Sequence, residues 1–521
     1  MLACCGAAAL LGLEAHPVAV EVDLAPGLPG FQLVGLSDAS GRDARERVRS
    51  ALRNSGFRLP QSRVVVSLAP ADLPKQGAGF DLAIALALLV ASGQLDPARL
   101  QAHWAFGELS LDGSLRPVQG VLAVVLAAQQ AAASGLILPQ ANASEAPVLD
   151  ALPLYPASSL SAVVAALQGR ASWSSRPQLH PCQPPFVGVD LQQVLGQSQG
   201  RRAAELAAAG GHHLLLVGPP GCGKTMLASA LLGLLPPLDN EQALMVSHIH
   251  TMVGLRSAGA PLLHQPPFRA PHHSSTAAAL VGGGLGPRPG ELTLAHHGLL
   301  FLDELAEFRR PVLDQLRQPL ESGEVLIARA KQALRFPSQT LLVGATNPCP
   351  CGWWGDPRQG CCCGQHRRQQ YWNRISGPLL DRFDLQVSLR SDACASPSSS
   401  PPEATAVVAR RVHRARQRMR QRNPSGRCNG RLTAAQLNGC VQLSPQAEGW
   451  WRDERLAHLL SGRRRHRLLA GAQTLAEVAA SPVVEPQHLA EALLFRSLER
   501  SVARDGGLDP GLAGRPGVAA D

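Results

Sequence analysis

One eight-residue segment, Gly218-Pro-Pro-Gly-Cys-Gly-Lys-Thr225, limits the possible folds of this chain more than any other stretch. It follows the apolar run His213–Val217 and precedes the helical pattern Met226–Leu235, which is the strand–loop–helix context of a phosphate-binding loop. Glycines let backbone N–H groups face phosphate oxygens, and the start of the next helix favours negative charge. We therefore expect ATP here, with Lys224 on the β and γ phosphates and Thr225 on Mg²⁺. The predicted nucleotide contacts are Gly218, Pro219, Pro220, Gly221, Cys222, Gly223, Lys224 and Thr225.

Two further apolar runs end in polar residues that suit the same site. Leu299–Leu302 leads into Asp303 and Glu304, and Leu341–Ala345 leads into Asn347 after one threonine. Together with the phosphate loop, this pattern predicts that Asp303 contacts Mg²⁺ through water and that Glu304 polarises the attacking water. It also predicts that Asn347 lies between that water and the γ-phosphate. Taken alone, the two acids would be a helix cap at a strand end, and Asn347 would be an ordinary turn residue.

The pattern along the chain predicts three structured parts of an α/β protein. Residues 1–170 mix short β-like runs with Ala/Leu-rich helical stretches. Residues 188–390 alternate helices with apolar strands, which implies a parallel sheet. Residues 404–505 look helical throughout, with an apolar stripe from Val408 to Met419. The predicted connections are a linker over residues 171–187, a second linker over residues 391–403 and a tail over residues 506–521.

Charge is concentrated in the C-terminal part. The 521 residues carry 49 basic and 39 acidic side chains, a net charge of +10, and the lysines are Lys75, Lys224 and Lys331 alone. Residues 405–467 hold 15 Arg and three acids, a net charge of +12, so the rest of the chain sums to −2. This segment could bind nucleic-acid phosphates. It could equally be a solvated helical surface, or its arginines could pair with neighbouring subunits.

The N-terminus and the hydropathy pattern predict a cytoplasmic protein without a membrane segment. Residues 1–13 contain an apolar run but lack the basic region of a signal peptide. No uninterrupted apolar run reaches the ~18 residues that a bilayer crossing requires.

Several motifs lie around the three predicted strands. Besides the phosphate loop, they are Phe268-Arg-Ala-Pro-His-His273, Val281-Gly-Gly-Gly284, Pro287-Arg-Pro-Gly-Glu-Leu292, Leu299-Leu-Phe-Leu-Asp-Glu304, Arg329-Ala-Lys-Gln332, Asn347-Pro-Cys-Pro-Cys351 and Ile375-Ser-Gly-Pro-Leu-Leu-Asp-Arg-Phe-Asp384. Together they resemble the AAA+ ATPases related to the magnesium-chelatase ATPase subunit, and more closely the bacterial ComM/YifB branch. The resemblance runs from about residue 10 to residue 500, which is nearly the whole chain.

The resemblance implies a hexameric ring that binds ATP at its subunit interfaces. Arg382 would be the arginine finger, which balances the transition-state charge on a neighbour's γ-phosphate. From the residues alone, a structural ion pair with Asp381 or Asp384 is the alternative. The family's second sensor arginine falls on Arg463, although two more arginines follow it directly.

Five of the twelve cysteines lie within residues 349–363. The pairs Cys349-Pro-Cys351 and Cys361-Cys-Cys363 could bind one tetrahedral Zn²⁺ as thiolates on a short loop. A redox pair or reduced bystander thiols would explain the same cysteines. The family pattern implies four zinc ligands and leaves Cys362 as an extra. These ligands are Cys349, Cys351, Cys361 and Cys363.

The first part of the chain resembles the family's Lon-protease-like domain, which has the ribosomal-protein S5-type α/β fold. The motifs are Gly27-Leu-Pro-Gly-Phe31, Leu68-Ala-Pro-Ala-Asp-Leu73 and Phe80-Asp-Leu82. A Ser–Lys protease needs a serine nucleophile beside a lysine of lowered pKa. Lys75 is the one lysine of this part, and no serine lies in a family nucleophile motif, which predicts a non-proteolytic accessory module.

The resemblance implies an ATP-driven motor that acts on DNA, by branch migration during homologous recombination of DNA imported in natural transformation. No base-reading motif is visible, so the predicted binding of branched or single-stranded DNA is independent of base sequence. A second interpretation keeps the motor but has it remodel a partner protein, as a chelatase ATPase drives metal insertion. A third is a non-enzymatic ATP-binding scaffold, against which the intact Glu304 argues.

Overall fold

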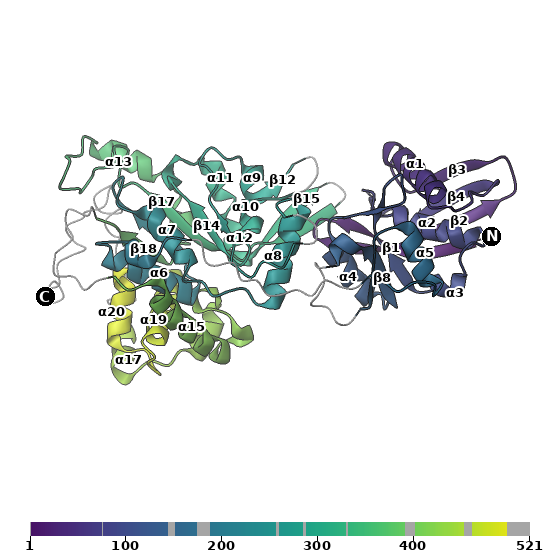
Figure 1. The fold of residues 1–521 in the computed structure, drawn as a ribbon. Helices are drawn as coiled ribbons and strands as arrows, with labels where there is room; N and C mark the ends of the chain where they lie inside the picture. The colour runs from purple at the N-terminus through teal and green to yellow at the C-terminus, as the bar shows by residue number, and fades with distance from the viewer. Residues whose placement is uncertain are drawn as a thin grey trace. The chain divides into compact units, whose positions relative to one another are not determined.

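The computed structural model describes residues 2–75, 77–143, 152–174, 188–256, 260–284, 288–329, 332–390, 402–452 and 461–496. The chain divides into two compact units, Met1–Gln183 with Asp239–His264 and Pro184–Leu238 with Gln265–Asp521 (Figure 1). Most of the two predicted linkers, and all of the predicted tail, lie outside the described residues.

A seven-stranded mixed sheet with the order β3-β4-β2-β1-β5-β8-β9 forms the centre of the first unit. Strands β1, β2 and β4 pair antiparallel, whereas β3 with β4, β1 with β5, β5 with β8 and β8 with β9 pair parallel. The strands of this unit are β1 (Leu2–Leu11), β2 (Glu14–Ala25), β3 (Gly30–Val34), β4 (Arg63–Ala69), β5 (His103–Ala105), β6 (Glu108–Leu109), β7 (Leu115–Arg116), β8 (Gly135–Pro139) and β9 (Leu154–Ala157).

Helices cover both faces of this sheet because its central strand is apolar on both sides. Ala7 and Ala9 of β1 pack in one core cluster with the fully buried α2, whereas Ala8 packs in a second cluster with α4. This alternation follows from the two-residue period of a strand. The helices of this unit are α1 (Asp38–Asn54), α2 (Asp81–Ala91), α3 (Pro97–Leu100), α4 (Val121–Gln130), α5 (Leu160–Leu167) and α8 (Asn240–Met252).

Helix α8 belongs to the first unit although its sequence falls inside the segment 188–390. Its buried His248 lies with Nε2 2.9 Å from the carbonyl oxygen of Leu13, at the end of the β1–β2 hairpin. Burial lowers the pKa of His248, which favours the neutral ring. The sequence pattern did not predict that residues 239–264 join the first unit, because a helical period does not reveal which core a helix packs into.

The second unit contains the parallel sheet that the sequence predicts. Its order is β11-β14-β17-β10-β18, and all four pairings are parallel. The phosphate-loop strand β10 lies between the strand that leads to Asn347 and the strand after Arg382. The strands of this unit are β10 (Leu214–Val217), β11 (Phe268–Arg269), β12 (Gly282–Gly283), β13 (Arg288–Pro289), β14 (Leu299–Leu302), β15 (Glu324–Arg329), β16 (Gln332–Pro337), β17 (Leu341–Thr346) and β18 (Leu385–Ser388).

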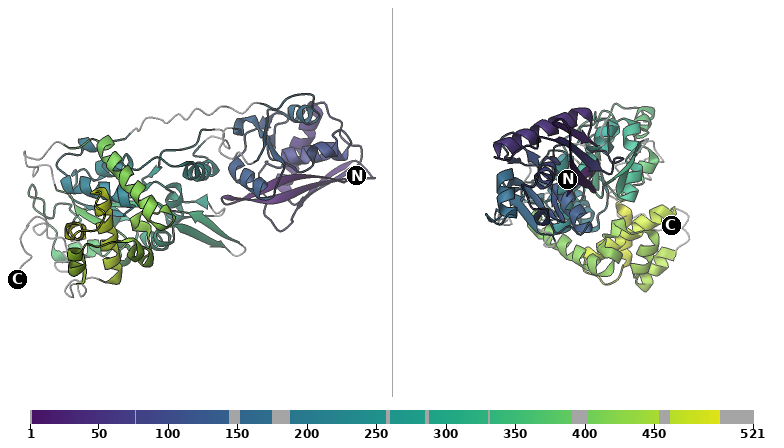
Figure 2. Two further views of the ribbon diagram at one scale, coloured as in Figure 1. Left: turned by 90° about the horizontal axis from the view of Figure 1, so that it is seen from below. Right: turned by 90° about the vertical axis from the view of Figure 1, so that its right-hand side faces the viewer.

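The C-terminal part of the second unit is helical, as predicted, and its helices lie together in each view (Figure 1, Figure 2). The predicted apolar stripe of α15 is buried and joins the core cluster of α6 and β10. In the part of the chain that the structure describes, we find no helix with the length and apolar character needed to cross a bilayer. The described α-helices of the second unit as a whole are α6 (Ser198–Gly210), α7 (Lys224–Leu232), α9 (Ala277–Val281), α10 (Glu291–Leu294), α11 (Arg310–Asp314), α12 (Arg317–Ser322), α13 (Gln365–Trp372), α14 (Gly377–Leu380), α15 (Thr405–Arg422), α16 (Ala434–Cys440), α17 (Pro445–Arg452), α19 (Gly462–Val478) and α20 (Pro486–Leu494).

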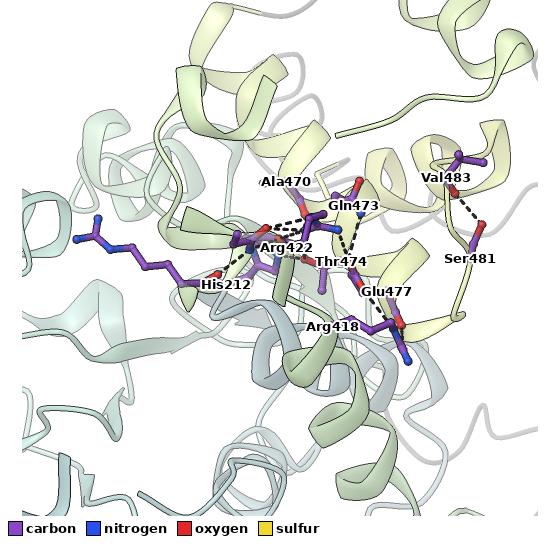
Figure 3. Close-up of polar contacts among 12 residues, drawn as sticks. His212, Arg418, Arg422, Ala470, Gln473, Thr474, Glu477, Ser481 and Val483 are labelled. Carbon is purple, nitrogen blue, oxygen red and sulfur yellow. Dashed lines mark hydrogen bonds and ion pairs between the residues drawn. The ribbon is translucent and has the colours of Figure 1, made fainter. Parts of the chain in front are cut away.

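A buried polar network joins these helices to the residues that precede β10 (Figure 3). His212 lies with Nε2 2.8 Å from Thr474 Oγ1, and Asn429 donates to the same hydroxyl at 3.1 Å. Arg422 donates to Asn429 at 2.8 Å and forms an ion pair with Glu477. Because unpaired polar groups are costly inside a core, these bonds tie the helical part to the sheet in one arrangement.

Candidate functional site

The phosphate loop connects the carboxyl end of β10 to the start of α7. Gly221 and Gly223 have φ angles of 76° and 89°, which side chains other than glycine rarely adopt. Gly218 N donates to Thr346 O at 3.2 Å, so the loop starts against the end of the neighbouring strand β17. The candidate site therefore lies at the carboxyl edge of the parallel sheet, where such sheets bind their ligands.

Lys224 stands at the centre of this site. Its Nζ donates to the carbonyl oxygens of Gly218 and Pro219 at 2.7 and 3.0 Å, and to Asn347 Oδ1 at 3.0 Å. Burial lowers the pKa of Lys224, and the neighbouring acids Asp303 and Glu304 act in the opposite direction. The fold thus brings together Lys224 and Asn347, which are far apart in the sequence.

Thr225 and Asp303 meet beside Lys224. Thr225 Oγ1 donates to Asp303 Oδ2 at 3.0 Å, and Asp303 Oδ1 accepts the backbone N–H of Glu304 at 2.9 Å. A hydroxyl and a carboxylate in contact are hard oxygen donors of the kind that Mg²⁺ prefers. These two side chains therefore fit a magnesium ion, and they are the residues that would hold it.

Glu304 follows directly and leaves the strand in an unusual conformation. Its backbone is left-handed, with φ 49° and ψ 45°, and its side chain is 54% exposed. The carboxylate Oε2 lies 2.8 Å from Nδ1 of His273. Glu304 is thus an accessible carboxylate beside Asp303, where a water molecule can reach it.

The four predicted cysteine ligands converge on one point. The sulfur of Cys349 lies 3.3 Å from that of Cys351 and 3.6 Å from that of Cys361, and all four sulfurs lie within 4.8 Å of one another. Four thiolates around one Zn²⁺ would be separated by about 3.8 Å, given Zn–S bonds of about 2.3 Å. Burial would raise the pKa of Cys351, but the backbone N–H of Trp353 and the neighbouring thiols lower it to about 6. The quartet therefore fits a structural zinc ion.

The cysteine loop also touches the phosphate loop. A Cβ added at Gly352 would lie 2.8 Å from Cδ of Pro220, so the backbone at Gly352 packs closely against the Pro220 ring. The indole Nε1 of Trp372 donates to Pro348 O at 3.1 Å and anchors the loop to the end of α13.

Arg382 and Arg463 share one acidic partner, Glu321. Arg382 Nη2 lies 3.0 Å from Glu321 Oε2, and the same guanidinium donates to two backbone carbonyls. Arg463 pairs with the other oxygen of Glu321. The structure differs from the alternative of an ion pair with Asp381 or Asp384. Asp381 lies 3.9 Å from Arg464, and Asp384 lies 2.6 Å from Arg467. Helix α12 carries Glu321, and nothing in the local sequence around Arg382 points to it.

Known proteins match almost the whole chain. YifB of Salmonella typhimurium is 42% identical over 496 residues, which are 94% of this chain and 96% of that protein. The competence protein ComM of Haemophilus influenzae is 41% identical over 505 residues, 94% of this chain and 97% of that protein. The chain belongs to the ComM/YifB family.

Family models agree with this assignment. Models described as magnesium chelatase, subunit ChlI, as subunit ChlI of Mg-chelatase and as the ChlI C-terminal part match residues 190–396, 20–142 and 402–496 respectively. The probable DNA helicase MCM9 of Arabidopsis thaliana is 28% identical over 219 residues, 42% of this chain and 28% of that protein. The chain is therefore an ATPase of the magnesium-chelatase-related AAA+ class.

In this member of the ComM/YifB family, the basic C-terminal segment is partly neutralised within its own chain. Arg411 pairs with Glu205 and Glu403, and Arg418 pairs with Glu477. These acids lie outside residues 405–467, so a charge count over the segment cannot include them. Part of the net charge of +12 is therefore balanced by acids from other parts of the same chain, a possibility that the charge count left out.

Sequence reasoning also missed two residues that support the site. The buried side chain of Gln197 donates to the carbonyl oxygens of Cys222, at 3.2 Å, and Arg390, at 2.6 Å, so it braces the phosphate loop. In the sequence, His273 is only the end of a family motif, but its Nδ1 lies 2.8 Å from Oε2 of Glu304. A local sequence signal existed for His273, because it ends the motif that begins with β11. Gln197 lies in no motif that the sequence displays.

Proposed function

We propose that this protein is an ATP-hydrolysing, hexameric AAA+ motor that acts on DNA. The proposal is that it is a branch-migration helicase that promotes homologous recombination in natural transformation. The observation that carries the motor is the convergence of Lys224, the Thr225–Asp303 pair, Glu304 and Asn347 at one edge of the parallel sheet.

Each side chain has a distinct role in the proposed reaction. Lys224 binds the β and γ phosphates, and Asn347, now bonded to Lys224, holds the γ-phosphate and the attacking water in place. Thr225 and Asp303 hold Mg²⁺, which would neutralise charge on the phosphates when bound. Glu304 accepts a proton from the water as it attacks, because its carboxylate is accessible.

The proposed ring gives Arg382 and Arg463 their roles. Both guanidinium groups now bind Glu321 of the same chain. As an arginine finger, Arg382 would exchange Glu321 for the γ-phosphate at the neighbouring subunit, and Arg463 would act as the second sensor. Burial, together with Arg467 and Arg317, lowers the pKa of Arg382, so a phosphate is a favourable replacement partner.

The DNA substrate is supported by the family rather than by a base-reading motif. One relative is named for competence and another as a probable DNA helicase. The exposed arginines of α15, Arg410, Arg414 and Arg420, add basic surface suited to phosphates. The zinc ion that we propose for the cysteine quartet has a structural role, because the loop packs against Pro220.

The decisive experiment measures ATP hydrolysis without DNA, with single-stranded DNA and with a four-way junction, at about 50 and 200 mM salt. We expect the junction to bind and to raise the rate, more strongly at the lower salt concentration. In Glu304→Gln, turnover should fall by roughly 10²–10⁴-fold while ATP binding remains, because the general base is lost. If neither DNA binds or stimulates hydrolysis, the DNA motor is excluded; unchanged turnover in Glu304→Gln would exclude the catalytic assignment.

A second candidate function is the remodelling of a partner protein. It is favoured by the match of all three parts of the chain to models described as magnesium chelatase subunits. This candidate predicts hydrolysis that DNA does not change and that a protein partner does. The same assay therefore separates the two functions.

A further inference from the structure

Helix α1 of the first unit carries a row of arginines on a face that turns away from the core (Figure 1). Its apolar residues Val48, Ala51 and Leu52 are buried and join the core cluster of this unit. The arginines follow one another after three, four and four residues, a spacing that places them on one face of a helix with about 3.6 residues per turn. We call these residues the arginine stripe: Arg42, Arg45, Arg49 and Arg53.

The arginine stripe is open to solvent. Arg42 and Arg53 are exposed, and the side chains of Arg45 and Arg49 are 36% and 43% exposed. Glu46 lies on the same face and pairs with Arg45 at 3.1 Å and with Arg49 at 3.8 Å. The four arginines less this one glutamate leave a net charge of +3 on the exposed face of α1.

The net charge of the N-terminal part conceals this concentration. Residues 1–170 hold 11 basic and 13 acidic side chains, a net charge of −2. Residues 42–63 hold seven of the basic and two of the acidic side chains, so this segment sums to +5 and the remainder of residues 1–170 sums to −7. Because an acidic remainder repels a polyanion from the other surfaces, the field of this part steers phosphates towards the arginine stripe.

The arginine stripe also differs from the basic C-terminal segment in its internal partners. In that segment, Arg411, Arg418 and Arg422 are held by acids of the same chain. Among the residues that the structure describes, neither Arg42 nor Arg53 forms an ion pair. An arginine without an internal acid keeps its guanidinium donors for a ligand.

The length and chemistry of the stripe fit a nucleic-acid backbone. From Arg42 to Arg53 the helix rises about 16 Å, at about 1.5 Å per residue. One strand of duplex DNA advances about 3.4 Å per nucleotide, so the stripe matches the length of about five successive phosphates. A planar guanidinium can bind two phosphate oxygens at once, which makes arginine well suited to such a contact.

We propose that the arginine stripe of α1 binds the phosphate backbone of DNA. This inference rests on the proposed DNA motor and names a contact surface for its substrate on the unit that does not contain the phosphate loop. Phosphate contacts carry no base information, so the stripe binds DNA irrespective of its sequence. Arg47 of the same helix is not part of this surface, because it pairs with the buried Asp81 at 2.6 Å.

The test measures binding of a fluorescently labelled four-way junction by the full chain at salt concentrations from about 50 to 200 mM. In Arg49→Gln/Arg53→Gln the dissociation constant should rise roughly 10- to 100-fold at about 100 mM salt, because two phosphate contacts are lost. The slope of the logarithm of affinity against the logarithm of salt concentration should become shallower by about 2. Glutamine is a good helix former, so the midpoint of urea unfolding should not change. Arg42→Gln/Arg45→Gln, at the other end of the stripe, should weaken binding similarly and gives a second reading if the first variant alters folding.

Two control variants separate charge on the stripe from charge in general. Arg49→Lys/Arg53→Lys should keep most of the affinity and of the salt slope, since an ammonium also binds phosphate. Arg99→Gln/Arg170→Gln removes the same charge from exposed positions of the first unit outside α1. Its dissociation constant should change less than about twofold, because salt screens distant charges.

Each result decides the proposal. Wild-type affinity and salt slope in both glutamine variants of the stripe overturn it, and so does an equal loss in the lysine variant or in Arg99→Gln/Arg170→Gln. Vesicles that contain phosphatidylserine present anionic groups of another kind. If the stripe variants lose binding to these vesicles but not to the junction, the stripe serves a membrane surface and the DNA contact is overturned. A wild-type chain that binds no junction overturns the proposed function itself, so the two failures are distinguishable.

Discussion

One lysine of each unit, Lys75 and Lys224, can be compared, and the two differ in exposure and in the groups that they bind. In the first unit, Lys75 is 5% exposed and donates to the carbonyl oxygens of Pro70 and Leu73. In the second unit, Lys224 also donates to two carbonyl oxygens, but it is partly exposed and shares its ammonium with Asn347. Burial lowers the pKa of both groups.

The acids differ in the same way. Asp81 of the first unit is fully buried, and Arg47 binds both its oxygens, at 2.6 and 3.1 Å. Asp303 and Glu304 of the second unit lie at a sheet edge, where they can be reached. Charges whose bonds close inside a core hold the fold, whereas charges left at the edge of a sheet can exchange their partners for a ligand.

The largest expected effect compares the two lysines directly. Lys224→Ala should lower ATP turnover on the order of 10³-fold, because a charge preorganised for the phosphates is lost, and should change the stability of the fold little. Lys75→Met should leave turnover unchanged but lower the free energy of unfolding by about 1–3 kcal/mol, because two carbonyls lose a donor. Steady-state kinetics and urea unfolding measure the two quantities. A lower ATP turnover in Lys75→Met would contradict the assignment of Lys75 to stability and of Lys224 to catalysis.

The next effect tests the buried pair of the first unit. Arg47→Met should lower the free energy of unfolding by about 2–3 kcal/mol at pH 7, because it leaves a buried carboxylate without its cation. The exposed Arg49 on the same helix is the matched control, and Arg49→Met should cost less than about 0.5 kcal/mol.

This loss should depend on pH in a definite direction. Burial raises the pKa of Asp81 to about 6, against the opposing effect of Arg47. The pKa in the folded chain is above that in the unfolded chain, so the contribution of Asp81 to stability is complete below pH 4 and is lost as the pH rises through about 6. The defect of Arg47→Met should therefore shrink at pH 5, where the carboxyl group can bind a proton. A defect that is equal at pH 5 and pH 7 would contradict this account.

The smallest expected effect concerns the cysteine loop, which carries the cysteine quartet and packs against the phosphate loop. We expect about one zinc ion per chain by elemental analysis, and Cys363→Ser should lose it. ATP affinity should then fall by roughly two- to tenfold, because Gly352 packs against Pro220 of the phosphate loop. Cys362→Ser, one residue away, should keep both the metal and the affinity. Metal-free wild-type protein with normal ATP binding would exclude the zinc ion.

Local patterns predicted much of the fold. The runs His213–Val217 and Leu299–Leu302 are strands within one residue of their predicted bounds, and the parallel sheet is confirmed. The apolar stripe of α15 is buried as predicted. Period and turn residues are properties of adjacent positions, so a sequence displays them directly. The membership of α8 in the first unit was not predicted, because joining a core depends on all the surfaces that compete for that helix.

In the candidate site too, some features could be predicted from the sequence and others depend on tertiary packing. The positions of Lys224, Asp303 and Asn347 at one sheet edge could be predicted, because each follows an apolar strand and parallel strands end at a common edge. The partners of side chains could not. Glu321 binds Arg382, and His273 reaches Glu304, across sequence distances that no spacing rule spans.

The sequence by itself determined the family, the phosphate loop and the presence of a parallel sheet, because these are written in consecutive residues and repeat periods. The tertiary structure alone decided which charges are buried and which carboxylate meets which cation. Ion pairs depend on distances of a few ångströms between side chains from separate elements, and only the packing of those elements sets such distances.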